Sequence, residues 1–408
     1  MAIADKDVVA IEQWRGLRNT ADASEFELGD LEAAVNVDIT DGLKLRSRKG
    51  FGSALFAGSH HSMFAHAGMW FGVASGALKR LFPSGASTTL RTGLLGERVD
   101  YATLGDRRVY YSDGNVTGCI DNDRHRTWGL EPPAYQPTAA TTGGTLPAGT
   151  YQYALTFVRS DGQESGTGVA GRVEVPALGG IQFAGIVVST DTDVVMKRLY
   201  ISPANDDTMY RALQLAPDET TATFYDRTPL LAPLTTQHLR PPVAGRPLAA
   251  HNARVYVADG AVLRYTEPQA PELMDIRKGF HMPEEITIVA PVKDGIYVGT
   301  RERLVFLPGD DPAKFSYDEA RMYGAVPGTL AYFNAEDFDP AAKDLAAVFM
   351  TTEGIVVGLN GGIIKNMTRD RWAFPVQARG AGVVRSHGGM IQYLTALEGT
   401  ETSGNTAF

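Results

Sequence analysis

The sequence has one cysteine, Cys119, in 408 residues, and no apolar run near the ~18 residues of a membrane-spanning helix. A single cysteine excludes an internal disulfide and a cysteine-rich zinc site. Positive charge is not in excess either: 38 Lys and Arg stand against 47 Asp and Glu, a formal net charge of −9. Proteins that bind DNA tightly through its phosphates are usually basic, so we expect no such binding, although the chain can line a passage for DNA. The opening MAIADKDVVA has no apolar stretch of a secretion signal, so we expect folding in a cytoplasm.

Motifs for catalysis and metal binding are also missing. There is no Gly-x-Ser-x-Gly elbow, and no glycine-rich phosphate loop ending in Lys-Ser/Thr. His60 and His61 are adjacent, so in a strand they point to opposite faces and do not readily share an ion, even with His66 nearby. The acidic stretches 121–123 and 310–311 lack the EF-hand spacing and are typical of turns. We therefore expect no metal and no cofactor.

Two further groups of residues invite an enzymatic interpretation. Cys119 has Asp121 and Asp123 nearby, whose charges disfavour a reactive thiolate, and although His125 is a possible activator, inert burial is the simpler expectation. Propeller glycosidases use clustered arginines, a tyrosine and carboxylates. This sequence offers such groups over one short stretch, at Arg107, Arg108, Tyr110 and Tyr111. It lacks, however, the Ser-x-Asp-x-Gly-x-Thr-Trp repeat of sialidase blades. We expect no catalytic residues and no enzymatic activity.

Glycine, by contrast, is abundant: 44 of 408 residues, against 22 prolines. That is about 11% against a usual ~7%, which favours many tight turns and β-structure. Alternating strands recur around glycine turns in residues 69–112 and 248–394, for example in MWFGVASGALKRLF (69–82) and DGIYVGTRERLVFL (294–307). In the second stretch, units spaced by roughly 40 residues predict the blades of a β-propeller, with a β-sandwich as the alternative. The number of blades stays open.

The stretch between these two regions has a different character. Pro132-Pro133 and a Thr/Gly-rich segment precede YQYALTFVRSDGQES (151–165), a strand that ends in an Asp161-Gly162 turn. About seven short strands in roughly 95 residues predict an immunoglobulin- or fibronectin-like sandwich. Because similar strands resume after Pro242, we interpret the sandwich as an insertion in the propeller.

The N-terminal segment combines two patterns. Leu28, Leu31 and Ala34–Val35 follow helical spacing, which predicts a short helix. Alternation at Val37 and Ile39, followed by Asp41-Gly42, then predicts a hairpin whose basic edge carries Arg46, Arg48 and Lys49. The expected organisation is an N-terminal helix and hairpin arm (1–52), the first part of the propeller (53–131), the inserted sandwich (132–242), the rest of the propeller (243–398) and a flexible tail (399–408).

This opening segment carries a resemblance to a known family. GLRNTADASEFELGDLEAAVNVDITDGLKLRSRKGF (16–51) resembles the start of tail nozzle, or tail tubular, proteins of short-tailed bacteriophages. Three later stretches, 101–114, 254–272 and 323–330, also look like that group. The resemblance implies a structural virion protein without catalytic residues, made in the host bacterial cytoplasm.

The resemblance also implies partners. We expect from it that six copies form a ring below the portal and the tail adaptor, near tail fibres or a needle. Double-stranded DNA would then pass through the bore without sequence-specific binding. A negative wall suits such a channel because it repels phosphates. The basic edge at Arg46, Arg48 and Lys49 would then suit a subunit or adaptor contact. Two alternatives remain: a receptor- or glycan-binding tail protein, expected to be trimeric, and a propeller glycoside hydrolase, expected as a monomer or dimer.

Overall fold

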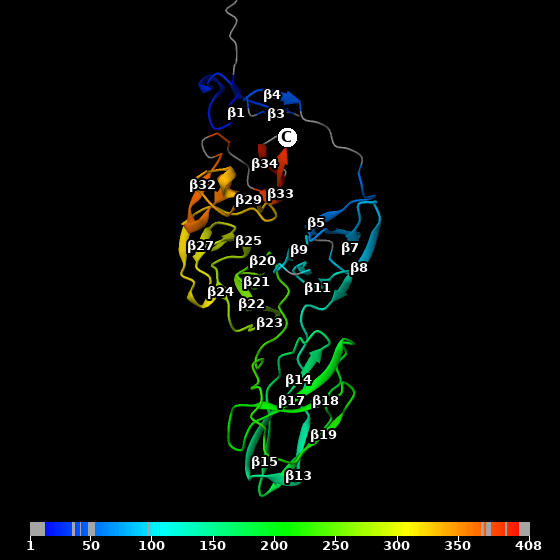
Figure 1. The fold of residues 1–408 in the computed structure, drawn as a ribbon. Helices are drawn as coiled ribbons and strands as arrows, with labels where there is room; N and C mark the ends of the chain where they lie inside the picture. Colours follow the sequence, from blue (N-terminus) through cyan, green and yellow to red (C-terminus); the bar gives the residue numbers. More distant parts are fainter. Residues whose placement is uncertain are drawn as a thin grey trace, which may run out of the picture. The chain divides into compact units, whose positions relative to one another are not determined.

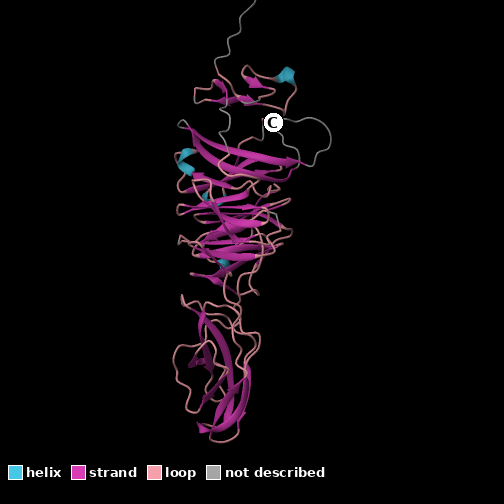
Figure 2. Cartoon of the chain, turned by 90° about the vertical axis from the view of Figure 1, so that its right-hand side faces the viewer, coloured by secondary structure: helices cyan, strands magenta, loops and turns pink. Residues whose placement is uncertain are grey.

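The computed structural model describes residues 13–34, 37–40, 42–47, 54–95, 98–105, 107–368, 371–372, 377–387 and 390–399. Over these residues the protein is built from β-strands joined by loops, and the helical elements are four short 3₁₀ turns (Figure 2). The turns are η1 (Ala23–Glu25), η2 (Pro312–Lys314), η3 (Ala335–Asp337) and η4 (Asn360–Gly362). None of the described segments is a helix long and apolar enough to cross a membrane. The chain divides into two compact units, which are described separately.

One unit comprises residues 59–82 and 87–281 and contains three propeller-type sheets (Figure 1). In each sheet four sequential strands form an antiparallel meander. The first has β5 (His61–His66), β6 (Met69–Ala74), β7 (Ala77–Leu81) and β8 (Ser87–Arg91); the second has β9 (Asp100–Ala102), β10 (Arg108–Ser112), β11 (Thr117–Asp121) and β12 (Arg124–Arg126). The third has β20 (Leu248–His251), β21 (Arg254–Asp259), β22 (Val262–Glu267) and β23 (Ala270–Met274), and β24 (Phe280–His281) also pairs with β22.

The second unit comprises residues 1–58, 83–86 and 282–408, and its described part contains two more such sheets. One has β25 (Ile286–Val292), β26 (Gly295–Thr300), β27 (Leu304–Pro308) and β28 (Asp318–Arg321); the other has β29 (Ala331–Asn334), β30 (Leu345–Thr351), β31 (Gly354–Gly358) and β32 (Ile364–Asn366). A long hairpin of β33 (Gln377–His387) and β34 (Met390–Gly399) follows. Val384 and Tyr393 of this hairpin pack on the core beside β29–β31.

Tight turns explain why these segments form meanders. Type I′ hairpin turns, which match the twist of the strands, need positive φ at both central residues. Ser75 and Gly76, between β6 and β7, have φ of 53° and 67°, and Ala67 and Gly68, between β5 and β6, have 48° and 77°. The glycine excess in the sequence therefore supplies the turns of the blades.

Apolar side chains fill the space between successive sheets within each unit. Phe71 of β6 and Tyr111 of β10 belong to the core between the first two sheets, and Tyr110 belongs to the core between the second and third. Adjacent tyrosines thus serve opposite faces of one blade, as the strand period of two requires. In the other unit a third such core joins β25–β28 to β29–β32. Sheets stacked face to face in this way form the predicted β-propeller, so that fold prediction is confirmed.

The inserted sandwich lies in sequence between β12 and β20, as predicted (green in Figure 1). One sheet has the order β13 (Thr138–Leu146), β16 (Gly179–Ala184), β19 (Thr221–Phe224). The other has the order β15 (Gly171–Val175), β14 (Gly149–Arg159), β17 (Val194–Ile201), β18 (Tyr210–Leu215). Inward residues of both sheets share one core, in which Tyr153 and Phe183 meet edge to face at 5.1 Å.

The predicted N-terminal helix is wrong. Gly16–Leu17 (β1) pairs in parallel with Asp30–Leu31 (β2), and the helical content there is the single turn η1. Gly29 has a φ of +98°, and a β-carbon at that position would lie 2.3 Å from the Gln13 carbonyl oxygen, so the backbone is not helical. Leu28 is 61% exposed, so the expected apolar stripe is not buried. Of the expected hairpin, β3 (Val37–Ile39) and β4 (Leu45–Ser47) do pair antiparallel, while Asp41 lies outside the described residues.

Candidate functional site

The basic group predicted as a subunit or adaptor contact is described only in part. Arg46 lies in β4, exposed, and faces Asp38 across the ladder. Asp38 is also 3.6 Å (Oδ2 to Nη2) from Arg385 of β33 in the same unit. Arg48 and Lys49 lie outside the described residues. The contact role of this group therefore stays a prediction.

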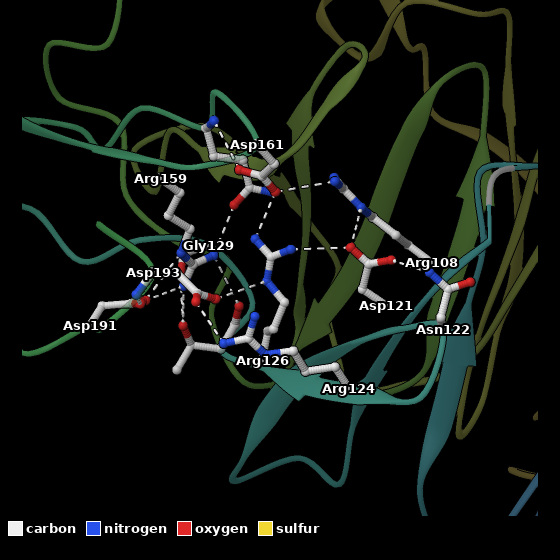
Figure 3. Close-up of polar contacts among 12 residues, drawn as sticks. Arg108, Asp121, Asn122, Arg124, Arg126, Gly129, Arg159, Asp161, Asp191 and Asp193 are labelled. Atoms are coloured by element: carbon white, nitrogen blue, oxygen red, sulfur yellow. Dashed lines mark hydrogen bonds and ion pairs between the residues drawn. The ribbon is translucent and has the colours of Figure 1, made fainter. Parts of the chain in front are cut away.

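A dense polar site instead lies where the second blade meets the sandwich (Figure 3). Four arginines and four aspartates form ion pairs here, which we call the arginine–aspartate network. Six of these residues are joined by shared ion pairs, and the separate pair of Arg159 and Asp191 is linked to them where the backbone N–H of Asp193 donates to Asp191 Oδ1 at 2.9 Å. The blade contributes Arg108 of β10, Asp121 of β11, and Arg124 and Arg126 of β12; the sandwich contributes Arg159 of β14, Asp161 of the next turn, and Asp191 and Asp193 ahead of β17.

Arg126 is the centre of the network. Its Nη2 donates to Asp161 Oδ2 at 2.7 Å, its Nη1 donates to Asp121 Oδ2 at 3.1 Å, and its Nε lies 3.7 Å from Asp193 Oδ2. Arg108 contacts two of the same carboxylates, with Nη2 3.2 Å from Asp161 Oδ2 and Nε 3.5 Å from Asp121 Oδ2. One blade arginine thus holds acids from both modules, which fixes the orientation of the sandwich turn on the blade.

Electrostatics in the network favour the ionised acids. Burial raises the pKa of Asp161, but the hydrogen bond from Arg126, the backbone N–H of Gln163 and the nearby arginine charges outweigh it, so the pKa is below its ordinary value. For Asp191 the same balance holds: burial raises the pKa, and the hydrogen bond from Arg159 contributes most to its net lowering. These acids are therefore charged and paired near neutral pH.

Arg159 anchors the sandwich end of the network. Arg159 is 2% exposed, and its Nε donates to Asp191 Oδ2 at 3.1 Å. Its other nitrogens reach the loop after β12, where Nη2 donates to the carbonyl oxygen of Gly129 at 3.1 Å and to the hydroxyl of Thr127. A guanidinium with its donors distributed over two modules acts as a buried cross-link between them.

A cavity of about 410 Å³ lies beside this network. Its walls come from the second blade, the third blade and the sandwich turn: Leu104, Arg108, Tyr110, Asp161, Gly162, Gln163, Ala253, Gln269, Pro271 and Glu272. Tyr110 is 1% exposed and stacks on Trp128 at 5.2 Å, and Trp128 Nε1 donates to the Pro271 carbonyl oxygen at 2.8 Å. This buried aromatic pair is therefore bonded to the β23 wall of the cavity.

Glu272 is the pocket acid outside the arginine–aspartate network. Burial raises its pKa and the charge of Asp161 adds to this, against the opposing effects of its own backbone N–H, Arg108 and Arg159. Gly129, with φ of +84°, allows the loop after β12 to approach β23, because a β-carbon there would lie 2.5 Å from the Glu272 carbonyl oxygen. The pocket therefore contains a half-buried carboxyl group beside polar amides.

The other sequence candidates are separated by the fold. Arg108 and Tyr110 line the pocket, whereas Tyr111 lies on the opposite blade face, where its hydroxyl is 2.8 Å from His125 Nε2. Burial and the charge of Arg91 lower the pKa of His125 to about 4, so it is neutral near pH 7. Cys119 is buried in the apolar core that contains Tyr110.

No metal centre is formed by the residues that the structure describes: they contain no group of three or more His, Cys, Asp or Glu side chains placed to hold an ion. His61 Nδ1 lies 2.9 Å from the Ser62 hydroxyl. The network and Glu272 were not predicted from the sequence. One signal for the network was present, because acidic and basic residues lie close together in the segment DNDRHR (121–126).

Comparisons with known proteins add similar structures but no family. No protein-family model matches the chain, and no curated protein matches its sequence. Among solved structures, virginiamycin B lyase from Staphylococcus aureus is 9% identical with a TM-score of 0.31, and the alignment covers 83% of this chain and 92% of that one. A streptogramin B lyase structure is likewise 9% identical, with a TM-score of 0.30 and coverage of 83% and 93%. The extracellular domain of a two-component system protein from B. thetaiotaomicron is 13% identical, with a TM-score of 0.27 and coverage of 66% and 34%. Similarity this weak supports no conclusion about activity.

Proposed function

We propose that this chain is a structural protein of a bacteriophage tail, a nozzle subunit that assembles into a six-membered ring in the host cytoplasm and becomes part of the virion. The observation that carries the proposal is the order of its modules: a short N-terminal β-arm, blades, an inserted sandwich, and further blades. The tail nozzle family, which the opening segment resembles, implies an N-terminal arm and an inserted sandwich, although the helix that it also implies in the arm is not observed. Fold alone does not define a function, so the proposal rests on that order and the resemblance together.

The chemistry of the chain is compatible with a channel wall. A net charge of −9 per copy repels the phosphates of passing double-stranded DNA, which keeps the DNA mobile. A sandwich cross-linked to its blade by buried ion pairs gives each subunit a fixed projection for contacts with the adaptor, tail fibres or a needle. The proposed role needs rigidity and charge, and it assigns no catalytic residue.

Mass photometry of the purified chain, alone and with a portal–adaptor assembly, tests the proposal. We expect a monomer that forms a six-copy ring on the assembly. Arg46→Glu is expected to weaken ring formation, because it reverses the exposed charge of the predicted contact group. Arg301→Glu, at another highly exposed arginine, serves as the matched control. A stable trimer, or a monomer that ignores the assembly, would overturn the nozzle proposal.

A second candidate is a receptor- or glycan-binding tail protein, and the presence of a polar cavity of ligand size supports a binding role of this general kind. A half-buried carboxyl, two amide side chains and an arginine face one cavity of about 410 Å³, which is within the usual size range of ligand sites. A trimer in mass photometry, together with saturable binding of a cell-surface saccharide, would support this candidate instead. A propeller glycoside hydrolase would in addition release reducing sugar.

A further inference from the structure

The arginine–aspartate network leaves Glu272 without an ion-pair partner among the residues that the structure describes. The four arginines and four aspartates of the network pair with one another. Glu272 is a fifth acid, and no ion pair or side-chain hydrogen bond to it occurs among the described residues. A half-buried carboxylate without a partner is unfavourable, and a cation brought by a ligand would remove that cost.

We propose that the pocket beside Glu272 binds an ammonium or guanidinium group. A free polyamine and a lysine or arginine side chain of a partner protein both carry this chemistry. The inference goes beyond the nozzle proposal and does not depend on it, since it concerns a ligand of the single chain. It also differs from the glycan alternative, because the ligand is a cation.

The walls of the pocket suit such a group and its aliphatic stem. Gln269 also lines the pocket, and its side-chain amide oxygen is an acceptor that can share the N–H donors of an ammonium or guanidinium group with Glu272. The amide oxygen of Gln163 already accepts from Arg159 Nη1 at 2.8 Å. Leu104, Ala253 and Pro271 offer apolar surface along which methylene groups can pack. The cavity of about 410 Å³ has room for a lysine-length chain.

Other ligand classes fit less well. Arg108 is the pocket cation, and its donors already contact Asp161 and Asp121, so an anion would have to displace these carboxylates. Sugars commonly stack on an exposed aromatic face. Here Tyr110 and Trp128 are 1% and 2% exposed and are stacked on each other, so they offer no such face.

Protonation of Glu272 gives the proposal an independent signature. The charged groups around it are Arg108 of β10, Arg159 of β14 and Asp161 of the sandwich turn. Burial raises the pKa of Glu272, whereas a bound cation would stabilise the carboxylate and lower that pKa again. Binding should therefore release protons, and the affinity should rise with pH.

Isothermal titration calorimetry of the full chain tests the proposal, with spermidine and the peptide acetyl-Gly-Lys-Gly-amide as probes. At neutral pH we expect Glu272→Gln to weaken binding by about tenfold, the effect of roughly 1.4 kcal/mol. Glu131→Gln makes the same charge change at an exposed residue outside the pocket and should bind within about twofold of the unmodified chain. We also expect the unmodified chain to bind more weakly near pH 5, and Glu272→Gln to lose this pH dependence.

Each result of this experiment is decisive. Spermidine binding without peptide binding identifies a polyamine site, and the reverse identifies a partner's side chain; both support the proposal. Equal binding by the unmodified chain and Glu272→Gln overturns it, as does saturable binding of inorganic phosphate or maltose without amine binding. The melting temperature of Glu272→Gln checks that this variant folds. The pH dependence of amine binding by the unmodified chain tests the proposal without any substitution. None of these measurements depends on ring assembly, so failure here leaves the nozzle proposal standing.

Discussion

Two junctions of the second blade use opposite chemistry. Against the first blade it presents a closed apolar core that contains Phe71, Val109 and Ile120. Against the sandwich it presents the arginine–aspartate network and the buried guanidinium of Arg159. Apolar burial is strong but has little directional preference, whereas charged hydrogen bonds fix geometry and respond to pH and salt. The comparison indicates that the blades are held together by bulk packing and that the sandwich is oriented by specific bonds.

The apolar junction should show the largest effect of a single substitution. Phe71 is fully buried, so Phe71→Ala should lower the free energy of unfolding by about 3–5 kcal/mol, through lost apolar burial and the cavity it leaves. Urea denaturation followed by tryptophan fluorescence measures this. Leu95→Ala, at an exposed leucine in the same unit, is the control and should change stability by less than about 0.5 kcal/mol. A cost below about 1 kcal/mol at Phe71 would show that this junction is not a well-packed core.

The polar junction should come next. Arg159→Met retains the bulk of the side chain but leaves Asp191 and the Gly129 carbonyl oxygen without their donor, and we expect a loss of about 3 kcal/mol. The same denaturation experiment applies, with Arg301→Met at an exposed ion pair as control. Adding Asp191→Asn should recover part of the loss, because the stranded charge is then removed. A near-zero effect of Arg159→Met would mean that packing alone orients the sandwich.

The contrast between these junctions also explains what the sequence could predict. Alternation and glycine turns are local, so hairpins such as 69–82 and the sandwich strand 151–159 could be predicted. The network joins residues far apart in sequence: Arg126 pairs with Asp161 at a separation of 35, Arg108 with Asp161 at 53, and Arg124 with Asp193 at 69. No local pattern encodes such pairs. The helix expected around Leu28 failed for a related reason, because pairing of β1 with β2 overrides helical spacing.

Acid should distinguish the two junctions. The pKa values of Asp161 and Asp191 in the folded chain are below the ordinary 3.8. Their contribution is therefore fully present above pH 3.8 or so, and it is lost as pH falls through the lower folded values. Below pH 3.8 or so the unfolded chain takes up a proton at the Asp161 carboxyl before the folded chain does, so we expect the stability difference between the unmodified chain and Arg126→Met to be smaller at pH 3 than at pH 6. The difference caused by Phe71→Ala should stay constant. A parallel decline of both differences would contradict the assignment of pH sensitivity to the network.

The smallest effect should come from the exposed rim of the network. The Arg124 side chain is 64% exposed, although its Nη2 is only 2.6 Å from Asp193 Oδ1. Water and salt screen such a pair, and holding the long side chain in place costs conformational entropy, so Arg124→Ala should lower stability by less than about 1 kcal/mol. Arg126 lies two residues further along β12, and its side chain is 11% exposed. It donates to Asp121 and Asp161 at similar distances, so it is the matched comparison. Suppose that Arg124→Ala lowers the free energy of unfolding as much as Arg126→Ala in the same denaturation experiment. The contribution of each ion pair in the network would then not depend on how deeply it is buried. The number of ion pairs would then hold the sandwich on its blade, rather than the few buried hydrogen bonds made by Arg126 and Arg159.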